Sequence, residues 1–150
     1  METQRTALAI NDLIIINNDR YYGYKTAVSE IREEDLKSLF TQFSNQSKAF
    51  ANDLRKFIPS EEAAPKDDET KNSGKLYRLW MDFRSAITDH DRKAILCSCE
   101  FGEDAAKKTY DEVLEHSQDI PVEAMSIIRR QREELQKGHD MVKSLRQAIA

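Results

Sequence analysis

The sequence contains few of the residues that interrupt helices. It has 4 Gly and 3 Pro among 150 residues, whereas 33% of its residues are charged. A fold of many short strands needs frequent Gly and Pro turns, so this composition disfavours an all-β protein and favours long helices. The length suffices for a core that needs no disulfide or metal, and we expect residues 1–150 to form one domain.

Strong charge of one sign and long apolar runs are also absent. The 23 Lys+Arg and 27 Asp+Glu residues give a net charge of -4, which provides no field to attract nucleic acid or an anionic membrane. The longest aliphatic run, at 13–16, is far shorter than the roughly 20 residues that cross a bilayer. The first residues lack a signal-peptide pattern. We therefore expect a cytoplasmic protein with no membrane span and no nucleic-acid partner.

Cysteine is scarce as well. The two cysteines, Cys97 and Cys99, are two positions apart in a segment with helical spacing. On a helix this spacing separates their side chains by about 200°, so a shared metal ion or a disulfide between them is disfavoured. We expect buried cysteines that act as small apolar residues.

Apolar residues recur at steps of three and four along most of the chain, which is the period of an amphipathic helix. Pro59 closes one of these segments and Pro121 lies in the first turn of another. The spacing predicts four long helices, over about 3–31, 34–58, 89–116 and 121–147.

The connection between the second and third long helices differs from the other two because it spans 59–88. It begins with fifteen residues, 59–73, that include no large apolar side chain, and it then regains helical spacing over 76–87. Matched helices with one long crossover are typical of ferritin-like folds. The sequence therefore predicts an all-α, ferritin-like four-helix bundle with a long B–C crossover that contains a short extra helix.

Polar residues interrupt the apolar stripes near the middle of each long helix. Glu103 occupies a core position between Cys99 and Ala106, and a lone ionised carboxylate is costly to bury. If the helices align, the interruptions form one core polar layer, for which the candidates are Asn17, Tyr21, Ser47, Glu103, Gln131 and His139. Such a layer either fixes helix register through hydrogen bonds or holds a metal. If it is structural, Glu103→Leu or Glu103→Gln should leave stability nearly unchanged or raise it.

The metal alternative can be tested against the ligand pattern of di-iron bundles. These proteins use a Glu-x-x-His pair on each of two helices, and the sequence contains no such pair. The second helix adds only Asp53 as a carboxylate between 36 and 58. The sequence therefore argues against a dinuclear site, and a mononuclear iron or manganese site formed by Glu103, His139 and Glu100 stays open.

Several stretches resemble a bacterial ferritin-like four-helix-bundle family that is catalogued as a domain of unknown function. They lie at 13–24, 40–54, 73–83, 95–110 and 139–146. The resemblance implies the bundle fold and a role in bacterial stress or envelope maintenance, with no established reaction.

One position departs from that family. An acidic residue often stands there two positions after the Gly-aromatic pair of the first helix, whereas Gly23-Tyr24 is followed here by Lys25 and Thr26. This departure argues against an inherited metal site.

Two functions remain after this comparison. Because the sequence carries no phosphate-binding loop, zinc-protease motif or nucleophile elbow, we expect a protein that is not an enzyme. The first hypothesis is a non-catalytic bundle without a cofactor that forms a homo-oligomer or binds a protein partner. The alternative is an iron- or manganese-binding protein with a reduced carboxylate and histidine site in its core.

Overall fold

The computed structural model describes residues 2–58, 74–116 and 119–149, and in these residues all regular structure is helical. The helices are α1 (Glu2–Glu30), α2 (Glu34–Arg55), α3 (Gly74–Thr88), α4 (Arg92–His116) and α5 (Val122–Gln147). The class is therefore all-α. The first part of the expected crossover, 59–73, lies outside the described residues.

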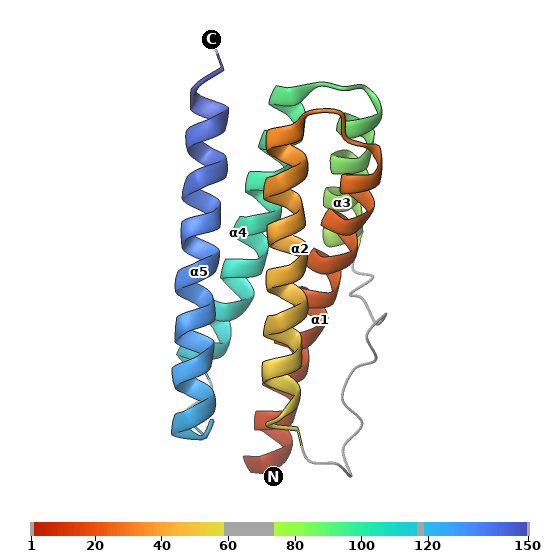
Figure 1. The fold of residues 1–150 in the computed structure, drawn as a ribbon. Helices are drawn as coiled ribbons and strands as arrows, with labels where there is room; N and C mark the ends of the chain where they lie inside the picture. The colour runs from red at the N-terminus through yellow and green to blue at the C-terminus, as the bar shows by residue number, and fades with distance from the viewer. Residues whose placement is uncertain (1, 59–73, 117–118, 150) are drawn as a thin grey trace.

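The four long helices lie side by side, and α3 lies outside them (Figure 1). In the view of Figure 1, α1 and α5 run upward while α2 and α4 run downward. Helix α1 packs on α2 and on α4, and α5 packs on α4 and on α2. Helix α3 packs on α4 and α1, so it covers the seam between those two helices.

Two helix ends differ from the expected positions for local reasons. Helix α2 ends at Arg55, because the chain already turns at 56–58 before it reaches Pro59. Helix α4 begins at Arg92, because His90 has a φ of 55° and breaks the helical path. The Asp91 carboxylate then accepts a hydrogen bond from the backbone N–H of Ala94 at 3.2 Å, which caps the first turn of α4.

The interior contains two apolar clusters at different heights along the bundle. The lower cluster includes Leu13 and Leu135, and the upper one includes Phe40 and Val142. Between them α1 buries four consecutive polar residues, at 17–20. The polar layer therefore sits within the core, with apolar packing above and below it.

Candidate functional site

The polar layer begins on one face of α1. Asn17, Arg20 and Tyr24 follow each other at steps of three and four, so their side chains lie along the same side of the helix. All three are buried. They face polar residues of the neighbouring helices, and the contacts between them define the candidate site.

The centre of the layer is an ion pair between α1 and α4. Arg20 Nε donates to Glu103 Oε2 at 2.8 Å, and Arg20 Nη2 donates to Glu103 Oε1 at 2.7 Å. The two side chains are 2% and 0% exposed, respectively. The guanidinium thus binds both carboxylate oxygens in a two-pronged geometry, which is the strongest common form of this contact.

The rest of the guanidinium is held by α2. Arg20 Nη1 donates to Ser47 Oγ at 2.8 Å, to Gln46 Oε1 at 2.9 Å and to the backbone oxygen of Phe43 at 3.2 Å. The guanidinium carbon also lies 4.7 Å from the centre of the Phe43 ring. Burial by itself would lower the pKa of Arg20, but the Glu103 carboxylate outweighs this effect and the pKa lies above its ordinary value. The arginine is therefore a permanent cation.

Glu103 has a further donor in Tyr24, whose hydroxyl donates to Oε2 at 2.9 Å. The same hydroxyl lies 3.1 Å from the sulfur of Cys99. Burial, followed by the nearby negative charge, raises the pKa of the Tyr24 hydroxyl and of the Cys99 thiol well above their ordinary values. Both groups stay protonated at neutral pH, so neither is prepared to act as a base or a nucleophile.

A second branch connects the layer to α5. Asn17 Nδ2 donates to the hydroxyl of Tyr110 at 2.8 Å, and that hydroxyl donates to Gln131 Oε1 at 2.6 Å. Ser47 Oγ donates to Asn17 Oδ1 at 2.9 Å. Gln131 Nε2 closes the branch on the backbone oxygen of Phe50 at 3.3 Å. The network therefore joins α1, α2, α4 and α5 through hydrogen bonds.

Helix α5 comes close to the ion pair because it has no side chain at Gly138. A Cβ there would lie 3.0 Å from Phe43 Cε1 and 3.1 Å from Glu103 Oε1. The glycine lets the α5 backbone cover the carboxylate, and it helps to exclude water from the layer.

Four of the expected core polar residues lie in this network. They are Asn17, Ser47, Glu103 and Gln131. Tyr21 lies outside it, because its hydroxyl accepts a hydrogen bond from Lys25 Nζ at 3.1 Å on the exposed side of α1.

The three expected metal ligands are separated. Glu103 points into the layer, whereas His139 and Glu100 lie at the outer edge of the α4–α5 contact. His139 Nε2 is 2.9 Å from Asp104 Oδ1 and 3.8 Å from Glu100 Oε1. Glu100 is also bound by Arg146, whose hydrogen bond and positive charge lower the pKa of that carboxyl.

Arg20 is the functional residue that the sequence reasoning missed. Arginine is normally a surface residue, so its place in α1 gave no reason to put it in the core. The signal was present in the spacing, because Arg20 follows Asn17 by three positions and precedes Tyr24 by four. A buried Glu103 needs a cation, and this position on the apolar face of α1 supplies it.

Within the described residues, no group of three or more His, Cys, Asp and Glu side chains is arranged to hold a metal ion. None of the described helices combines the length and the apolar character required to span a membrane.

The chain was also compared with known proteins. A family model described as "Domain of unknown function (DUF2383)" matches residues 5–116, a stretch that runs from α1 to the end of α4. No curated protein sequence matches the chain significantly.

Proposed function

The chain belongs to the family of this domain of unknown function, and we propose that it is a non-catalytic, ferritin-like bundle that acts by association with a second copy of itself or with a protein partner. The ferritin-like assignment is supported by the directions of the helices. Helices α2 and α4 run the same way, so the chain between them returns along the bundle, and α3 forms part of that return (Figure 1).

The observation that carries the proposal is the Arg20–Glu103 pair. Bundle proteins place metals in a polar layer at this depth, where carboxylates need a cation. Here the chain supplies the cation itself, and it uses both carboxylate oxygens in doing so. Because the polar groups of the layer bind each other, we infer that the layer fixes how the helices are aligned. Association with a second copy or a partner would then use the surface of the bundle.

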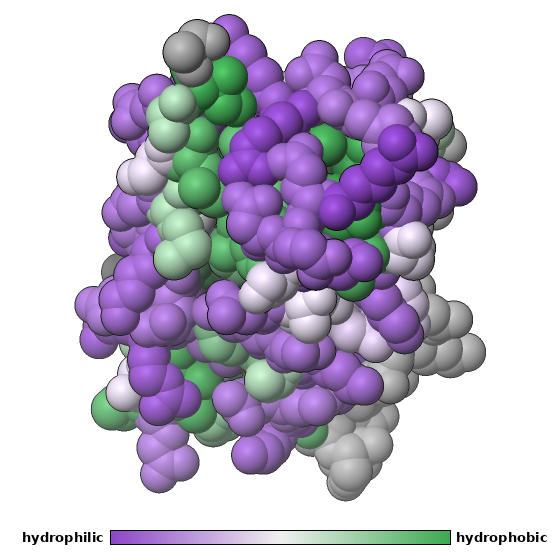
Figure 2. Space-filling view, turned by 45° about the horizontal axis from the view of Figure 1, so that its top comes forward, coloured by the Kyte–Doolittle hydropathy of each residue, from purple (hydrophilic) through white to green (hydrophobic). Residues whose placement is uncertain are grey.

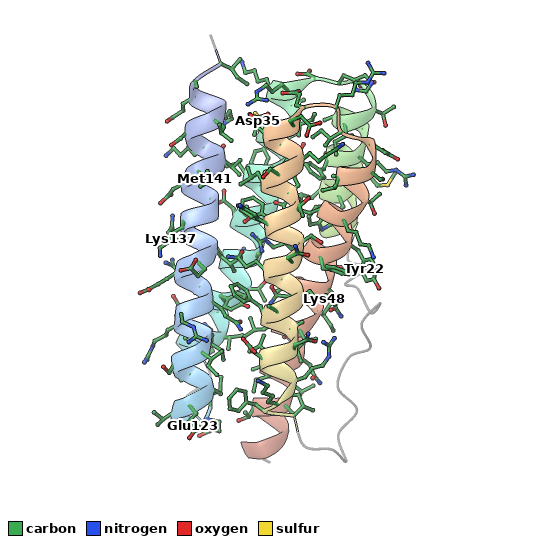
Figure 3. The ribbon with its side chains drawn as sticks, viewed as in Figure 1. Tyr22, Asp35, Lys48, Glu123, Lys137 and Met141 are labelled. Carbon is green, nitrogen blue, oxygen red and sulfur yellow. The ribbon has the colours of Figure 1, made fainter. Side chains whose placement is uncertain are left out.

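The surface carries exposed apolar side chains that could take part in association. Phe101 on α4 is 64% exposed and Met141 on α5 is 52% exposed. Figure 2 shows a face that is mostly hydrophilic, with hydrophobic residues gathered near the C-terminal end of α5. Figure 3 places Met141 on that part of α5, one turn beyond the exposed Lys137. A contiguous apolar patch on a protein surface is typical of a contact site.

Sedimentation velocity over a range of protein concentrations tests the proposal. We expect species heavier than the 17.4 kDa chain to increase with concentration. Phe101→Ser or Met141→Ser should weaken this association if the substituted residue lies in the contact surface. Lys137→Ser, at an exposed polar position of α5, is the matched control and should leave the association unchanged. A monomer at every concentration, unchanged by the variants, would contradict self-association.

The alternative is iron or manganese binding, and one observation favours a site outside the core. His139 Nε2 lies 2.9 Å from Asp104 Oδ1 where α4 meets α5, so one imidazole and one carboxylate are close together there. Imidazole and carboxylate groups are ligands for both metals. Titration with Fe²⁺ or Mn²⁺ tests this alternative, because binding at the edge would be lost in His139→Ala and kept in Glu103→Gln.

We also propose a cytoplasmic location. Cys97 and Cys99 are both free thiols, which is usual in a reducing compartment. Cell fractionation tests this, and recovery of the protein in an oxidising compartment would contradict it. A bacterial source and a role in stress stay predictions of the resemblance.

A further inference from the structure

We propose that a basic and aromatic surface on the outer side of α1 and α2 binds an acidic segment of a protein partner. The surface consists of Tyr21, Tyr22 and Lys25 of α1 and Lys48 of α2, and we call it the tyrosine–lysine patch. The inference rests on the proposed function, because it names the chemistry of a partner with which the bundle would associate.

Two cationic side chains converge on the ring of Tyr21. Lys25 Nζ lies 5.3 Å from the centre of that ring, and Lys48 Nζ lies 5.5 Å from it. Lys25 follows Tyr21 by four positions on α1, whereas Lys48 reaches the ring from α2, and both lysines are exposed. Figure 3 shows Lys48 on α2 and Tyr22 on the adjacent α1. Because the face of the ring attracts ammonium groups, it brings two positive charges from different helices to one place.

The polar groups of the tyrosine–lysine patch are hydrogen-bond donors that lack a negative partner. Lys25 Nζ donates to the Tyr21 hydroxyl at 3.1 Å, so that hydroxyl keeps its own proton to donate. In the described part of the chain neither lysine pairs with a carboxylate, and no acceptor takes the Tyr21 proton. A carboxylate only accepts hydrogen bonds and carries negative charge, so it matches these donors.

Both helix segments that carry the patch lack acidic residues. Residues 36–52 of α2 are the longest stretch of the chain without Asp or Glu, and residues 20–29 of α1 contain none either. The chain as a whole has a net charge of -4, so its overall charge repels an acidic partner. A protein segment with several Asp or Glu residues would therefore be steered to the patch, where local charge is favourable.

The two tyrosines favour a protein as the source of the carboxylates. The Tyr22 ring packs edge-on against the Tyr21 ring, with 5.0 Å between their centres and 65° between their planes. Both side chains are half-buried, so they offer apolar surface that is held in place before a partner arrives. Tyrosine is enriched in protein contact sites because it buries a large area and loses little side-chain entropy.

The patch is small for a nucleic acid or a lipid surface. Nucleic-acid binding usually neutralises several phosphates along the backbone, and anionic lipids are usually recognised by clusters of about four to eight Lys and Arg residues. Here two lysines meet at one ring. The exposed large apolar side chains of the described residues, which a membrane would receive, include none on α2. These two partners therefore serve as the other arms of the test.

Fluorescence anisotropy with a dye-labelled oligoglutamate peptide tests the inference. The full-length protein should bind this probe in a saturable way, and the affinity should fall as salt is added. The Lys25→Ala, Lys48→Ala double variant should bind at least about tenfold more weakly. Tyr21→Leu keeps both lysines and removes the ring that gathers them, and it should weaken binding by about two- to fivefold. Circular dichroism of each variant checks that the bundle is folded.

The matched control removes the same charge from another helix. Lys137 and Lys143 are exposed on α5, and the Lys137→Ala, Lys143→Ala double variant should keep the affinity for the peptide within about twofold. A single-stranded DNA oligonucleotide and vesicles that contain phosphatidylserine are the other two probes. Both should bind the unchanged protein more weakly than the peptide does.

Three results would overturn the inference. They are no binding of the peptide by the unchanged protein, an equal loss of binding in the two double variants, and tighter binding of DNA or vesicles that depends on Lys25 and Lys48. Sedimentation velocity of the same preparations keeps this inference separate from the proposed function. Association that depends on Phe101 or Met141 would leave the proposed function standing when the peptide does not bind.

Discussion

Replacing Arg20 by Met should destabilise the protein by about 3–5 kcal/mol, because it leaves the Glu103 carboxylate in the core without its cation. In this variant Tyr24 is the one side-chain donor to Glu103 that the structure shows, and the carboxylate is fully buried. Glu103 would then take up a proton to avoid the buried charge, so the loss of stability should shrink as the pH falls. The starting stability of a domain of this size, about 5–15 kcal/mol, is large enough for the change to be measured.

Replacing Glu103 by Leu should cost a similar amount, which is more than the sequence alone led us to expect for this substitution. Removal of the carboxylate leaves the Arg20 guanidinium buried with only uncharged acceptors from α2. The double variant Arg20→Met, Glu103→Leu removes both charges. It should return to within about 1 kcal/mol of the unchanged protein, or exceed it, because apolar pairs replace buried ion pairs well.

The remaining polar groups support this estimate for the double variant. Ser47 keeps Asn17 as a partner, and the Tyr24 hydroxyl keeps the Cys99 sulfur. The coupling between the two substitutions, measured by urea unfolding of all four proteins at pH 7, should be several kcal/mol. Additive effects, or a cost below about 1 kcal/mol for Arg20→Met alone, would refute the reasoning.

Three further predictions concern packing and pH. Gly23→Ala should lower the free energy of unfolding in urea by about 1–3 kcal/mol, because the added Cβ would displace the Trp80 indole. The fluorescence emission of Trp80 should also shift to the red. Unchanged emission would contradict the close contact between Gly23 and Trp80. Gly138→Ala should cost less, because its Cβ would meet Phe43 at 3.0 Å instead of overlapping a ring, while both substitutions gain about 1 kcal/mol in helix propensity. A cost above that of Gly23→Ala would contradict this ranking. Folding raises the pKa values of Tyr24 and Cys99. Above about pH 9–10 the unfolded chain therefore loses these two protons while the folded chain keeps them, so the free energy of unfolding should fall as the pH rises. Cys99→Ala should make the fall of unfolding free energy with pH less steep by about 1.4 kcal/mol per pH unit. An unchanged steepness would contradict the raised pKa of Cys99.

The sequence allowed the helices to be predicted well because apolar spacing reports the buried face directly. Leu96, Glu103 and Tyr110 lie on the expected stripe of α4, and all three are buried. The helix ends were less predictable, since the end of α2 and the start of α4 depend on local turns. The φ of 55° at His90 is not visible in a periodic pattern.

The polar layer could be predicted in part only. Glu103 was recognisable because a carboxylate on an apolar stripe must be compensated, but the sequence does not show which cation compensates it. Arg20 lies 83 positions away, and their contact depends on how α1 and α4 are rotated against each other. The rotation of α5, which the sequence does not show either, places Gly138 against the layer and turns the adjacent His139 to the edge. One position on a helix is a turn of about 100°, which separates core from surface.

Metal content tests the central claim most directly, since the account holds that Arg20 supplies the cation of the core. The protein would be purified without chelator, incubated with Fe²⁺ or Mn²⁺, desalted and analysed for both elements, with Glu103→Ala as the matched variant. We predict no stoichiometric iron or manganese that depends on Glu103. About one metal ion per chain, lost in Glu103→Ala, would contradict the account and would return the polar layer to a metal site.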